Sequence, residues 1–257
     1  MNGAQDTTKR RRLPDACRLN RAHKNGHRPV KSGNVQIIVF MNYLLRKIMS
    51  TDDRYYYEPA KGHGLPHDPL NAIVGPRPIG WISSRNAAGQ RNLAPYSFFN
   101  CFNYRPPIIG FASSGWKDSV ANIVETGEFV WNLTTRSLAV KMNESSASLE
   151  RGVDEFEFAG LTAQPGTLVA ADRVLESPVN FECRLTQCIQ LKTAAGGDID
   201  TWLVLGEVVA VHIAPHLLVD GIYQTALAEP VLRAGGPSAY YEISEDLRFD
   251  LIRPDAR

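Results

Sequence analysis

The fold is decided by residues 79–119, which read IGWISSRNAAGQRNLAPYSFFNCFNYRPPIIGFASSGWKDS. Two apolar-rich runs, Ile79–Arg85 and Asn92–Asn100, flank the loop Asn86–Gln90, whose length fits a β-hairpin. A Pro-Pro pair then ends the extension, and Ile108–Ala112 has the pattern of a short buried strand. The stretch therefore predicts antiparallel strands that are neighbours in the sequence.

Strands continue beyond this stretch and alternate with short helices. Ser119–Glu125 and Ser137–Ser145 have helical character, whereas Glu128–Leu133 and Trp202–Ile213 are rich in strand-forming residues. Val179–Leu185 alternates apolar and polar residues, which is typical of a half-buried strand. Because the helices fall in the connections, we expect a mainly β fold with peripheral helices, a closed or split antiparallel β-barrel, and not a doubly wound parallel sheet.

Composition is that of a soluble globular protein, with 44% hydrophobic and 21% charged residues among 257. The net charge is +1, but residues 1–50 contain eleven Lys/Arg and two Asp and so carry +9. The other residues carry −8 by difference, which argues against nucleic-acid binding by the main domain. We expect one domain over residues 54–245, followed by a C-terminal tail over residues 246–257.

The basic segment 1–50 is predicted to be a disordered extension, or to arise from an upstream start with Met41 or Met49 as the working start. A targeting or nucleic-acid role for this segment is the alternative. Its apolar run 35–45 is too short to span a bilayer, and no secretory cleavage site follows it. We therefore expect a cytoplasmic protein without a membrane segment.

Metal-binding side chains give little support for a metal site. Cys183 and Cys188 lie five residues apart on one predicted strand. They therefore point to opposite faces and share neither a metal nor a disulfide unless a bulge intervenes. His63 and His67 are separated by a segment with Gly and Pro, which argues against a metal pair on a helix. We expect no metal and buried free thiols.

No catalytic residue is assigned from the sequence. His212 lies in a predicted strand and is expected to be structural or on the surface, not a general base. The acids of Asp154–Glu157 are expected to form a solvated loop face, with Phe156 or Phe158 packing inward. A G-x-S-x-G elbow is absent, which argues against Ser-His-Asp catalysis.

The loop Ser113–Ser119 leads into the first predicted helix, which we expect to be capped by Asp118 or Ser119 and to end at Gly127. Free backbone N–H groups and the helix dipole at such an N-terminus attract an anion, and Lys117 adds a full charge. The loop hydroxyls are further donors, so a phosphate monoester is the natural ligand. The alternative is an ordinary capped helix with a solvated lysine. The loop is not a P-loop, because its G-x4-G-K-[ST] pattern is absent.

The segment Asn92–Ser97 suits the approach of a flat ring to the backbone. Asn92, Ala94 and Ser97 keep side chains short, and Pro95 interrupts a strand pattern, which favours an edge or a bulge. An edge leaves amides and carbonyls able to bind a heterocycle. The alternative is a plain edge strand of a barrel.

These segments together resemble the flavin reductase-like FMN-binding family. That family includes flavoredoxin-type proteins and the reductase components of two-component monooxygenases such as nitrilotriacetate monooxygenase. The resemblance covers about residues 70–235. Its motifs are Pro78–Ser84, Asn92–Asn100, Arg105–Pro107, Gly115–Ser119, Asn122-Ile123, Gly152–Thr162, Glu176–Pro178, Glu182–Leu185 and Gly206–Val208.

The resemblance implies an FMN-binding split barrel with Greek-key-like connections, in a homodimer with FMN near the subunit interface. A ligand with a ring and a phosphate needs both sites described above. On the matching positions, the ring and the ribityl chain are lined by Ser83, Ser84, Asn92, Leu93, Ala94, Pro95, Tyr96 and Ser97. The phosphate is held by Ser113, Lys117, Asp118 and Ser119.

The implied reaction is hydride transfer from NADH or NADPH to the flavin and onward to an acceptor or a partner monooxygenase. The cofactor then supplies the chemistry, which explains why no acid/base pair is visible. Trp81, Tyr96 and Trp116 are candidates for stacking near the flavin, or equally for core or dimer contacts. The alternative function is a non-catalytic, flavoredoxin-like electron carrier, since no G-x-G-x-x-G fingerprint marks a nicotinamide site.

Overall fold

The computed structural model describes residues 54–150 and 152–254. The described residues from Glu58 onward form one compact unit. The helices are α2 (Leu70–Ile73), α3 (Asp118–Thr126), α4 (Ala139–Glu144) and α5 (Glu155–Phe158), with 3₁₀ turns at Pro59–Lys61, Pro215–Leu217, Ala226–Ala228 and Glu245–Leu247. The strands are β1 (Arg77–Pro78), β2 (Gly80–Arg85), β3 (Arg91–Tyr96), β4 (Phe99–Tyr104), β5 (Pro107–Ser114), β6 (Glu128–Asn132), β7 (Ala163–Gln164), β8 (Arg173–Val174), β9 (Val179–Lys192), β10 (Asp198–Ile213), β11 (Leu218–Val219), β12 (Ile222–Tyr223), β13 (Val231–Arg233) and β14 (Tyr240–Glu242).

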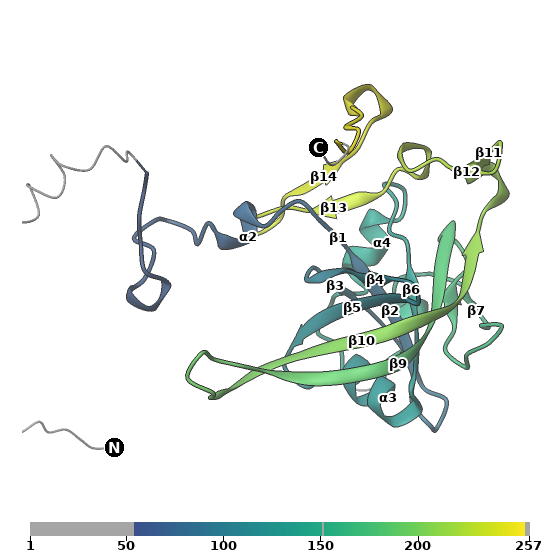
Figure 1. Ribbon diagram of the computed structural model, residues 1–257. Coiled ribbons are helices and arrows are strands. Elements are labelled where there is room, and N and C mark those ends of the chain that lie inside the picture. Colours follow the sequence, from purple (N-terminus) through teal and green to yellow (C-terminus); the bar gives the residue numbers. More distant parts are fainter. Residues whose placement is uncertain (1–53, 151, 255–257) are drawn as a thin grey trace, which may run out of the picture. The chain divides into compact units, whose positions relative to one another are not determined.

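Seven of these strands form one antiparallel sheet in the order β3-β2-β6-β9-β10-β5-β4. The predicted hairpin is confirmed, because β2 pairs with β3 in register from Gly80–Tyr96 to Arg85–Arg91. The strands β3 and β4 lie at the two ends of the sheet, yet only Ser97 and Phe98 separate them in the chain. The sheet must therefore curl until its two edges are neighbours at this corner (Figure 1).

The prediction of one strand over Asn92–Asn100 is wrong. The strand breaks at Ser97 and Phe98, where the chain passes from one edge of the curled sheet to the other. Two contacts hold the corner: Arg77 Nε donates to the Ser97 carbonyl at 2.9 Å, and Ala112 N donates to the Phe98 carbonyl at 2.9 Å. These partners are far from the corner in the sequence, so the local pattern does not show the break.

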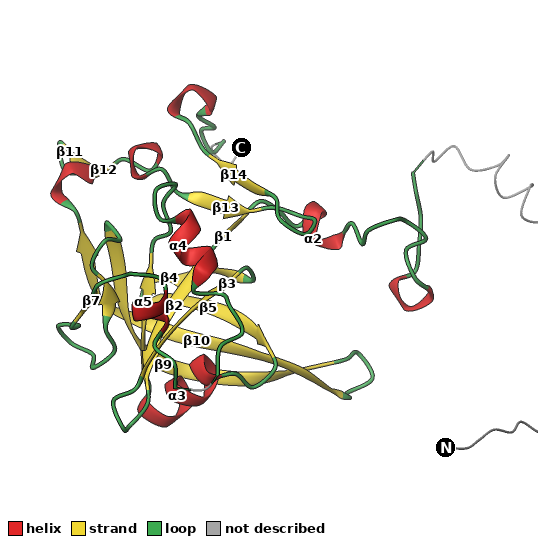
Figure 2. Ribbon diagram, turned by 180° about the vertical axis from the view of Figure 1, so that it is seen from behind, coloured by secondary structure: helices red, strands yellow, loops and turns green. Residues whose placement is uncertain are grey.

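Two buried clusters lie on opposite faces of the sheet. Ile82 of β2 belongs to the larger cluster inside the curl, with Phe111 and Phe129. Its neighbour Trp81 points to the other face, as strand alternation requires, and packs in a second cluster with Phe156. The short helices α4 and α5 contribute to this second cluster and contact β3 (Figure 2).

A bulge in β9 changes the expected arrangement of the cysteines. Leu185 pairs with Gly206 and Gln187 pairs with Leu205, so Thr186 is an extra residue in the ladder. Cys183 and Cys188 therefore face the same core: Cys183 lies within it and Cys188 packs against it. Both are free thiols, and burial raises the pKa of each.

The helix predicted over Ser119–Glu125 is α3. Its predicted end is confirmed, because Gly127 has a left-handed backbone with φ of 75° and its amide bonds to the Ile123 carbonyl. The predicted cap is wrong by one position: Lys117 is the N-cap and makes no side-chain capping bond. Within residues 54–150 and 152–254, no helix is long and apolar enough to cross a membrane.

Candidate functional site

A cavity of about 330 Å³ lies where the edge strand β3 meets the N-terminus of α3. Pockets for small ligands typically have volumes of roughly 300 Å³ and above. Two further groups complete the wall: the segment Ser145–Leu149 after α4, and Glu155 at the start of α5. The lining residues are Asn92, Ala94, Pro95, Tyr96, Lys117, Asp118, Ser119, Ser145, Ser146, Ala147, Ser148, Leu149 and Glu155.

The loop before α3 is shaped so that Lys117 stands at the helix cap. Gly115 has φ of +90°, a conformation that favours glycine, and its amide donates to the Asp200 carbonyl at 2.9 Å. Ser113 Oγ donates to the Gly115 carbonyl at 2.9 Å. The amides of the first turn of α3 have no carbonyl within the helix to bind. With the dipole of a nine-residue helix, they make this end of the cavity attractive to an anion.

A hydrogen bond joins the two halves of the cavity. Asn92 Nδ2, on β3, donates to Ser119 Oγ, on α3, at 2.8 Å, and both residues are buried. From the sequence, Asn92 was assigned to the ring and ribityl chain of the ligand and Ser119 to its phosphate. In the structure they form one wall.

Tyr96 brings a buried hydroxyl to the same cavity. Only 7% of Tyr96 is exposed, and no atom of the described residues meets hydrogen-bond geometry with its hydroxyl. Burial raises the pKa of Tyr96, while the nearby hydroxyls of Ser119 and Ser113 oppose that rise in part. The phenol is therefore neutral, with the hydroxyls of Ser119 and Ser113 close to it.

The segment Ser145–Leu149 was not expected at the site from the sequence. It is fixed at its start by a hydrogen bond from Trp81 Nε1 to Ser145 Oγ at 3.0 Å, and Ser145 Oγ donates in turn to the Met142 carbonyl at 2.8 Å. The signal that was available is the serine-rich composition directly after a predicted helix. Because its partner Trp81 is 64 residues away, the sequence gives no indication of where this segment lies.

Glu155 also belongs to the cavity, and the prediction that the acids of Asp154–Glu157 form a solvated face is wrong for it. Glu155 Oε2 accepts a hydrogen bond from the Leu93 amide of β3 at 3.0 Å. Burial raises the pKa of Glu155. Of the two aromatic candidates beside it, Phe156 is buried and Phe158 is exposed.

Five residues proposed for the site do not line this cavity. Ser83 is buried and donates to the carbonyls of Asp172 and Val130. Ser84, on the opposite face of β2, accepts from Asn122 Nδ2 at 3.4 Å. Leu93 packs in the cluster of Trp81. The other two, Ser97 and Ser113, hold the corner after β3 and the loop before α3.

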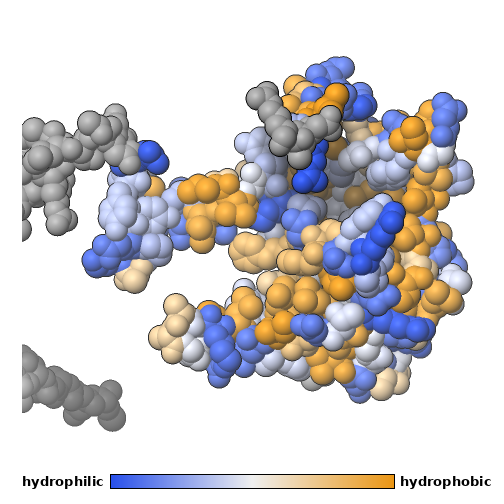
Figure 3. Space-filling model, viewed as in Figure 1, coloured by the Kyte–Doolittle hydropathy of each residue, from blue (hydrophilic) through white to orange (hydrophobic). Residues whose placement is uncertain are grey.

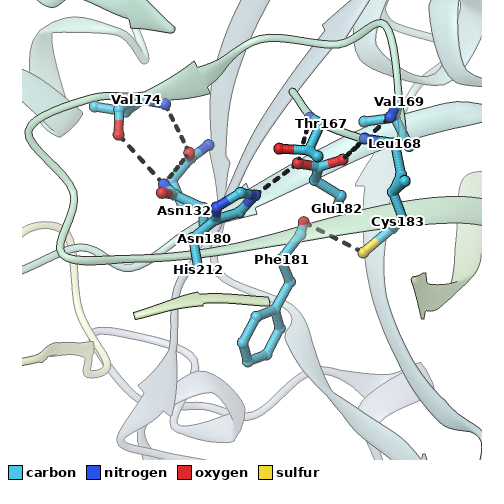
Figure 4. A network of polar contacts seen from close by, with 10 residues as sticks. All are labelled: Asn132, Thr167, Leu168, Val169, Val174, Asn180, Phe181, Glu182, Cys183 and His212. Carbon is cyan, nitrogen blue, oxygen red and sulfur yellow. Dashed lines mark hydrogen bonds and ion pairs between the residues drawn. The ribbon is translucent and has the colours of Figure 1, made fainter. Parts of the chain in front are cut away.

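A second polar cluster surrounds Glu182 and lies apart from the cavity (Figure 4). The fully buried carboxylate accepts hydrogen bonds from His212 Nε2 at 2.6 Å and from the backbone amides of Thr167, Leu168 and Val169. Burial raises the pKa of Glu182, but these hydrogen bonds outweigh it, so the pKa lies below its ordinary value. His212 therefore anchors a buried acid, as expected of a structural histidine.

The described part of the chain has no cluster of side chains that could bind a metal ion. Residues 54–150 and 152–254 contain no group of three or more His, Cys, Asp or Glu side chains placed to hold an ion. The cavity is instead lined mainly by hydroxyls and amides, with one lysine and the carboxyl groups of Asp118 and Glu155. Such a wall suits a polar organic anion.

A curled antiparallel sheet with a hydroxyl-rich pocket at its edge strand defines the molecule as an antiparallel β-barrel protein. The chain belongs to the flavin reductase like domain family, whose model matches residues 75–227. An uncharacterized protein of Halalkalibacterium halodurans is 33% identical over 190 residues, which are 72% of this chain and 89% of that protein.

Solved structures agree with the family. Nitrilotriacetate monooxygenase component B from Bacillus cereus is 29% identical with a TM-score of 0.67, over 79% of this chain and 98% of that one. A structure from Shewanella frigidimarina with a split barrel domain is 24% identical with a TM-score of 0.64, over 71% of this chain and 90% of that one. The expected antiparallel split barrel is thereby confirmed.

Proposed function

We propose that this protein binds FMN in the cavity between β3 and α3 and passes hydride or electrons from NADH or NADPH to an acceptor. The observation that carries the proposal is the cavity wall itself, in which Lys117 and the first-turn amides of α3 lie beside the edge strand β3. A phosphate accepts from those amides and pairs with the charge of Lys117. Membership in the flavin reductase like family supports a flavin as its source.

The phosphate end of the ligand belongs at the N-terminus of α3. Lys117 supplies a positive charge at the cap, and Ser119 supplies a hydroxyl and a first-turn amide. Asp118 also lines the cavity as the first helical residue. Ser113 acts through the loop, because its hydroxyl fixes the Gly115 carbonyl and with it the turn that presents Lys117.

The ring and the ribityl chain belong along β3. This strand is the edge of the sheet, so its outward backbone groups have no neighbouring strand. Ala94 and Pro95 line the cavity with small or compact side chains, which permits a flat ring to approach the backbone. The serines of Ser145–Ser148, on the facing wall, are suited to the ribityl hydroxyls. The edge of the sheet is held in place by the contacts described above for Ser83, Ser84, Leu93 and Ser97.

Bound FMN would supply the hydride-accepting chemistry. The residues of this chain bind its phosphate, position its ring at the edge of β3 and hold that edge in place. No side chain is assigned a proton-transfer step. Because the flavin would supply the chemistry and the protein the binding, the proposal requires no paired acid and base at the cavity.

We further propose a homodimer that uses the outer face of β4, β5 and β10. Ile109 and Phe111 of β5 face the core, so Gly110 faces outward, where Leu205 and Phe102 lie over it. Phe102 is 56% exposed. Hydrophobic side chains gather over this part of the sheet in Figure 3. Exposed apolar faces of this kind mark protein–protein contacts.

A partner oxygenase is the proposed electron acceptor, and the cytoplasm the proposed compartment. The similarity to nitrilotriacetate monooxygenase component B motivates the first, because that protein is by name one component of a monooxygenase. The reduced state of Cys101, Cys183 and Cys188 motivates the second.

The experiment is an anaerobic titration of the FMN-loaded protein with NADH and with NADPH, followed by the loss of flavin absorbance. Rapid bleaching by either nucleotide supports the oxidoreductase. Binding of FMN without bleaching by either would favour the electron carrier. A protein that gains no flavin absorbance when FMN is added would exclude both.

A further inference from the structure

Glu155 places a second carboxyl group, besides that of Asp118, in the wall of a cavity that otherwise suits an anion. Its position is fixed by the hydrogen bond from the Leu93 amide to Oε2 at 3.0 Å. Leu93 is on the edge strand that we assign to the ring, and Lys117 of the same cavity is assigned to the phosphate. Glu155 thus lies within the space that the ligand enters.

No cation of the described residues forms an ion pair with Glu155. The basic side chain on β3, Arg91, forms an ion pair with Asp154. Its Nε lies 2.7 Å and its Nη2 2.6 Å from Asp154 Oδ2. A further 3.5 Å contact joins Arg91 to Glu157. Glu155 therefore has hydrogen bonds but no compensating charge of its own.

The surroundings of Glu155 favour its neutral form. Burial is the main cause of its raised pKa, and the charges of Asp154 and Asp118 raise the pKa further, against the hydrogen bonds from the Leu93 amide and its own amide. The segment Ser145–Leu149 on the facing wall has no titratable side chain. The charged or titratable groups around it are Lys117 and Asp118 on α3, Tyr96 and Arg91 on β3, and Asp154 and Glu157 on α5.

We propose that Glu155 binds the phosphate-bearing ligand as a neutral carboxylic acid that donates its O–H to a phosphate oxygen. The inference rests on the proposed function, since it requires a phosphate monoester in this cavity. At a pH where the free protein has the carboxylate, binding then takes up one proton from solvent onto Glu155. The carbonyl oxygen of the acid continues to accept from the Leu93 amide. Glu155 is in this way a specificity-determining residue, because a phosphate dianion binds beside it only when the Glu155 carboxyl group carries a proton.

The sign of the pH dependence follows from the order of the two pKa values. The ligand dianion raises the pKa of Glu155 above its value in the free protein. Below both values the carboxyl is neutral throughout, and binding costs no proton. As the pH rises from the lower to the higher value, affinity falls by up to about tenfold per pH unit, because one proton must be taken up.

The test measures the affinities of FMN and riboflavin calorimetrically at a series of pH values from mildly acidic to mildly basic. The proteins are the full chain, Glu155→Gln and Glu157→Gln. Glutamine at position 155 keeps an oxygen for the Leu93 amide but has no titration. Glu157 is the matched control, because it belongs to the same short helix, is exposed and does not line the cavity.

We expect the FMN affinity of the full chain to fall with pH relative to Glu155→Gln, while the ratio to Glu157→Gln stays constant. The comparison cancels the titration of the phosphate itself. For riboflavin, which has no phosphate, both ratios are expected to stay constant.

If FMN binds, but the ratio of its affinities for the full chain and for Glu155→Gln does not change with pH, this inference is overturned and the proposed function stands. Absence of FMN binding by the full chain would overturn both. Should Glu155→Gln fail to fold, proton uptake by the full chain is counted directly, from FMN binding enthalpies in buffers of different ionisation enthalpy. The protons taken up by the phosphate itself are first subtracted. The inference is then contradicted if FMN binding takes up no more protons than riboflavin binding.

Discussion

Asn92 Nδ2 donates a hydrogen bond to Ser119 Oγ at 2.8 Å, and this contact joins the edge strand β3 to the first turn of α3. Replacement of Asn92 by Ala removes it and frees both elements to shift. A neutral hydrogen bond contributes about 1 kcal/mol, so we expect FMN affinity to fall about fivefold. Fluorescence titration measures it. Asn71→Ala, exposed on α2, is the control and should bind as the full chain does.

Lys117 is expected to recognise the phosphate and not the ring. A hydrogen bond to a charged group is worth roughly 1.5–3 kcal/mol, so Lys117→Ala should weaken FMN binding about 10- to 100-fold. Riboflavin binding should change less than about threefold by the same argument. Lys192→Ala is the control, because Lys192 is exposed on β9 and pairs with Asp198. Equal losses for the two ligands would refute the assignment of Lys117.

Gly206 has no room for a side chain. A Cβ at this position would lie 2.3 Å from Cε1 of Phe129, whose ring is in the core. We expect Gly206→Ala to lower the free energy of unfolding by about 1–3 kcal/mol, as overpacked cores do. Gly197→Ala is the control, because its Cβ would meet only Thr193 Oγ1 at 3.3 Å. Urea unfolding compares the two, and equal stabilities would show that the core can adjust at Gly206.

Glu182 should make stability sensitive to acid. Its pKa is lowered in the folded protein, so the stabilisation is complete above its ordinary value of 4.5 and is lost as the pH falls through the folded value. Glu182→Gln presents an amide to three backbone donors and His212, and should cost about 2–4 kcal/mol near neutral pH. The difference should shrink below pH 4.5.

Thermal unfolding from neutral pH to acid measures this difference. Glu144→Gln, exposed on α4, is the control and should leave stability unchanged. A Glu182→Gln variant whose destabilisation stays constant with pH would show that the charge of Glu182 does not contribute.

The sequence was sufficient for most strands of the sheet and for placing seven of the proposed site residues, Asn92, Ala94, Pro95, Tyr96, Lys117, Asp118 and Ser119, around one cavity. The turn Asn86–Gln90 predicted the hairpin, and Lys117 before α3 predicted an anion site, because these signals are local. It was not sufficient where the partner is distant. The break at Ser97 depends on Arg77 and on the curl of the sheet. Glu155 seemed solvated because its partner, the Leu93 amide, is 62 residues earlier in the chain.

Local patterns also miss a single added residue. In a regular strand, alternation would place Cys183 and Cys188 on opposite faces, whereas the bulge at Thr186 turns both toward the core. Residues around Thr186 carry no Gly or Pro that would mark the bulge. The strand could thus be predicted, but its register could not.

The central claim is that the cavity between β3 and α3 binds FMN through its phosphate. The most direct measurement is a pair of titrations of the full chain, one with FMN and one with riboflavin, at equal pH and salt. We predict that FMN binds at least about tenfold more tightly, because the interactions with Lys117 and with the first-turn amides of α3 require the phosphate. Equal affinities for the two flavins, or no binding of FMN, would contradict the claim.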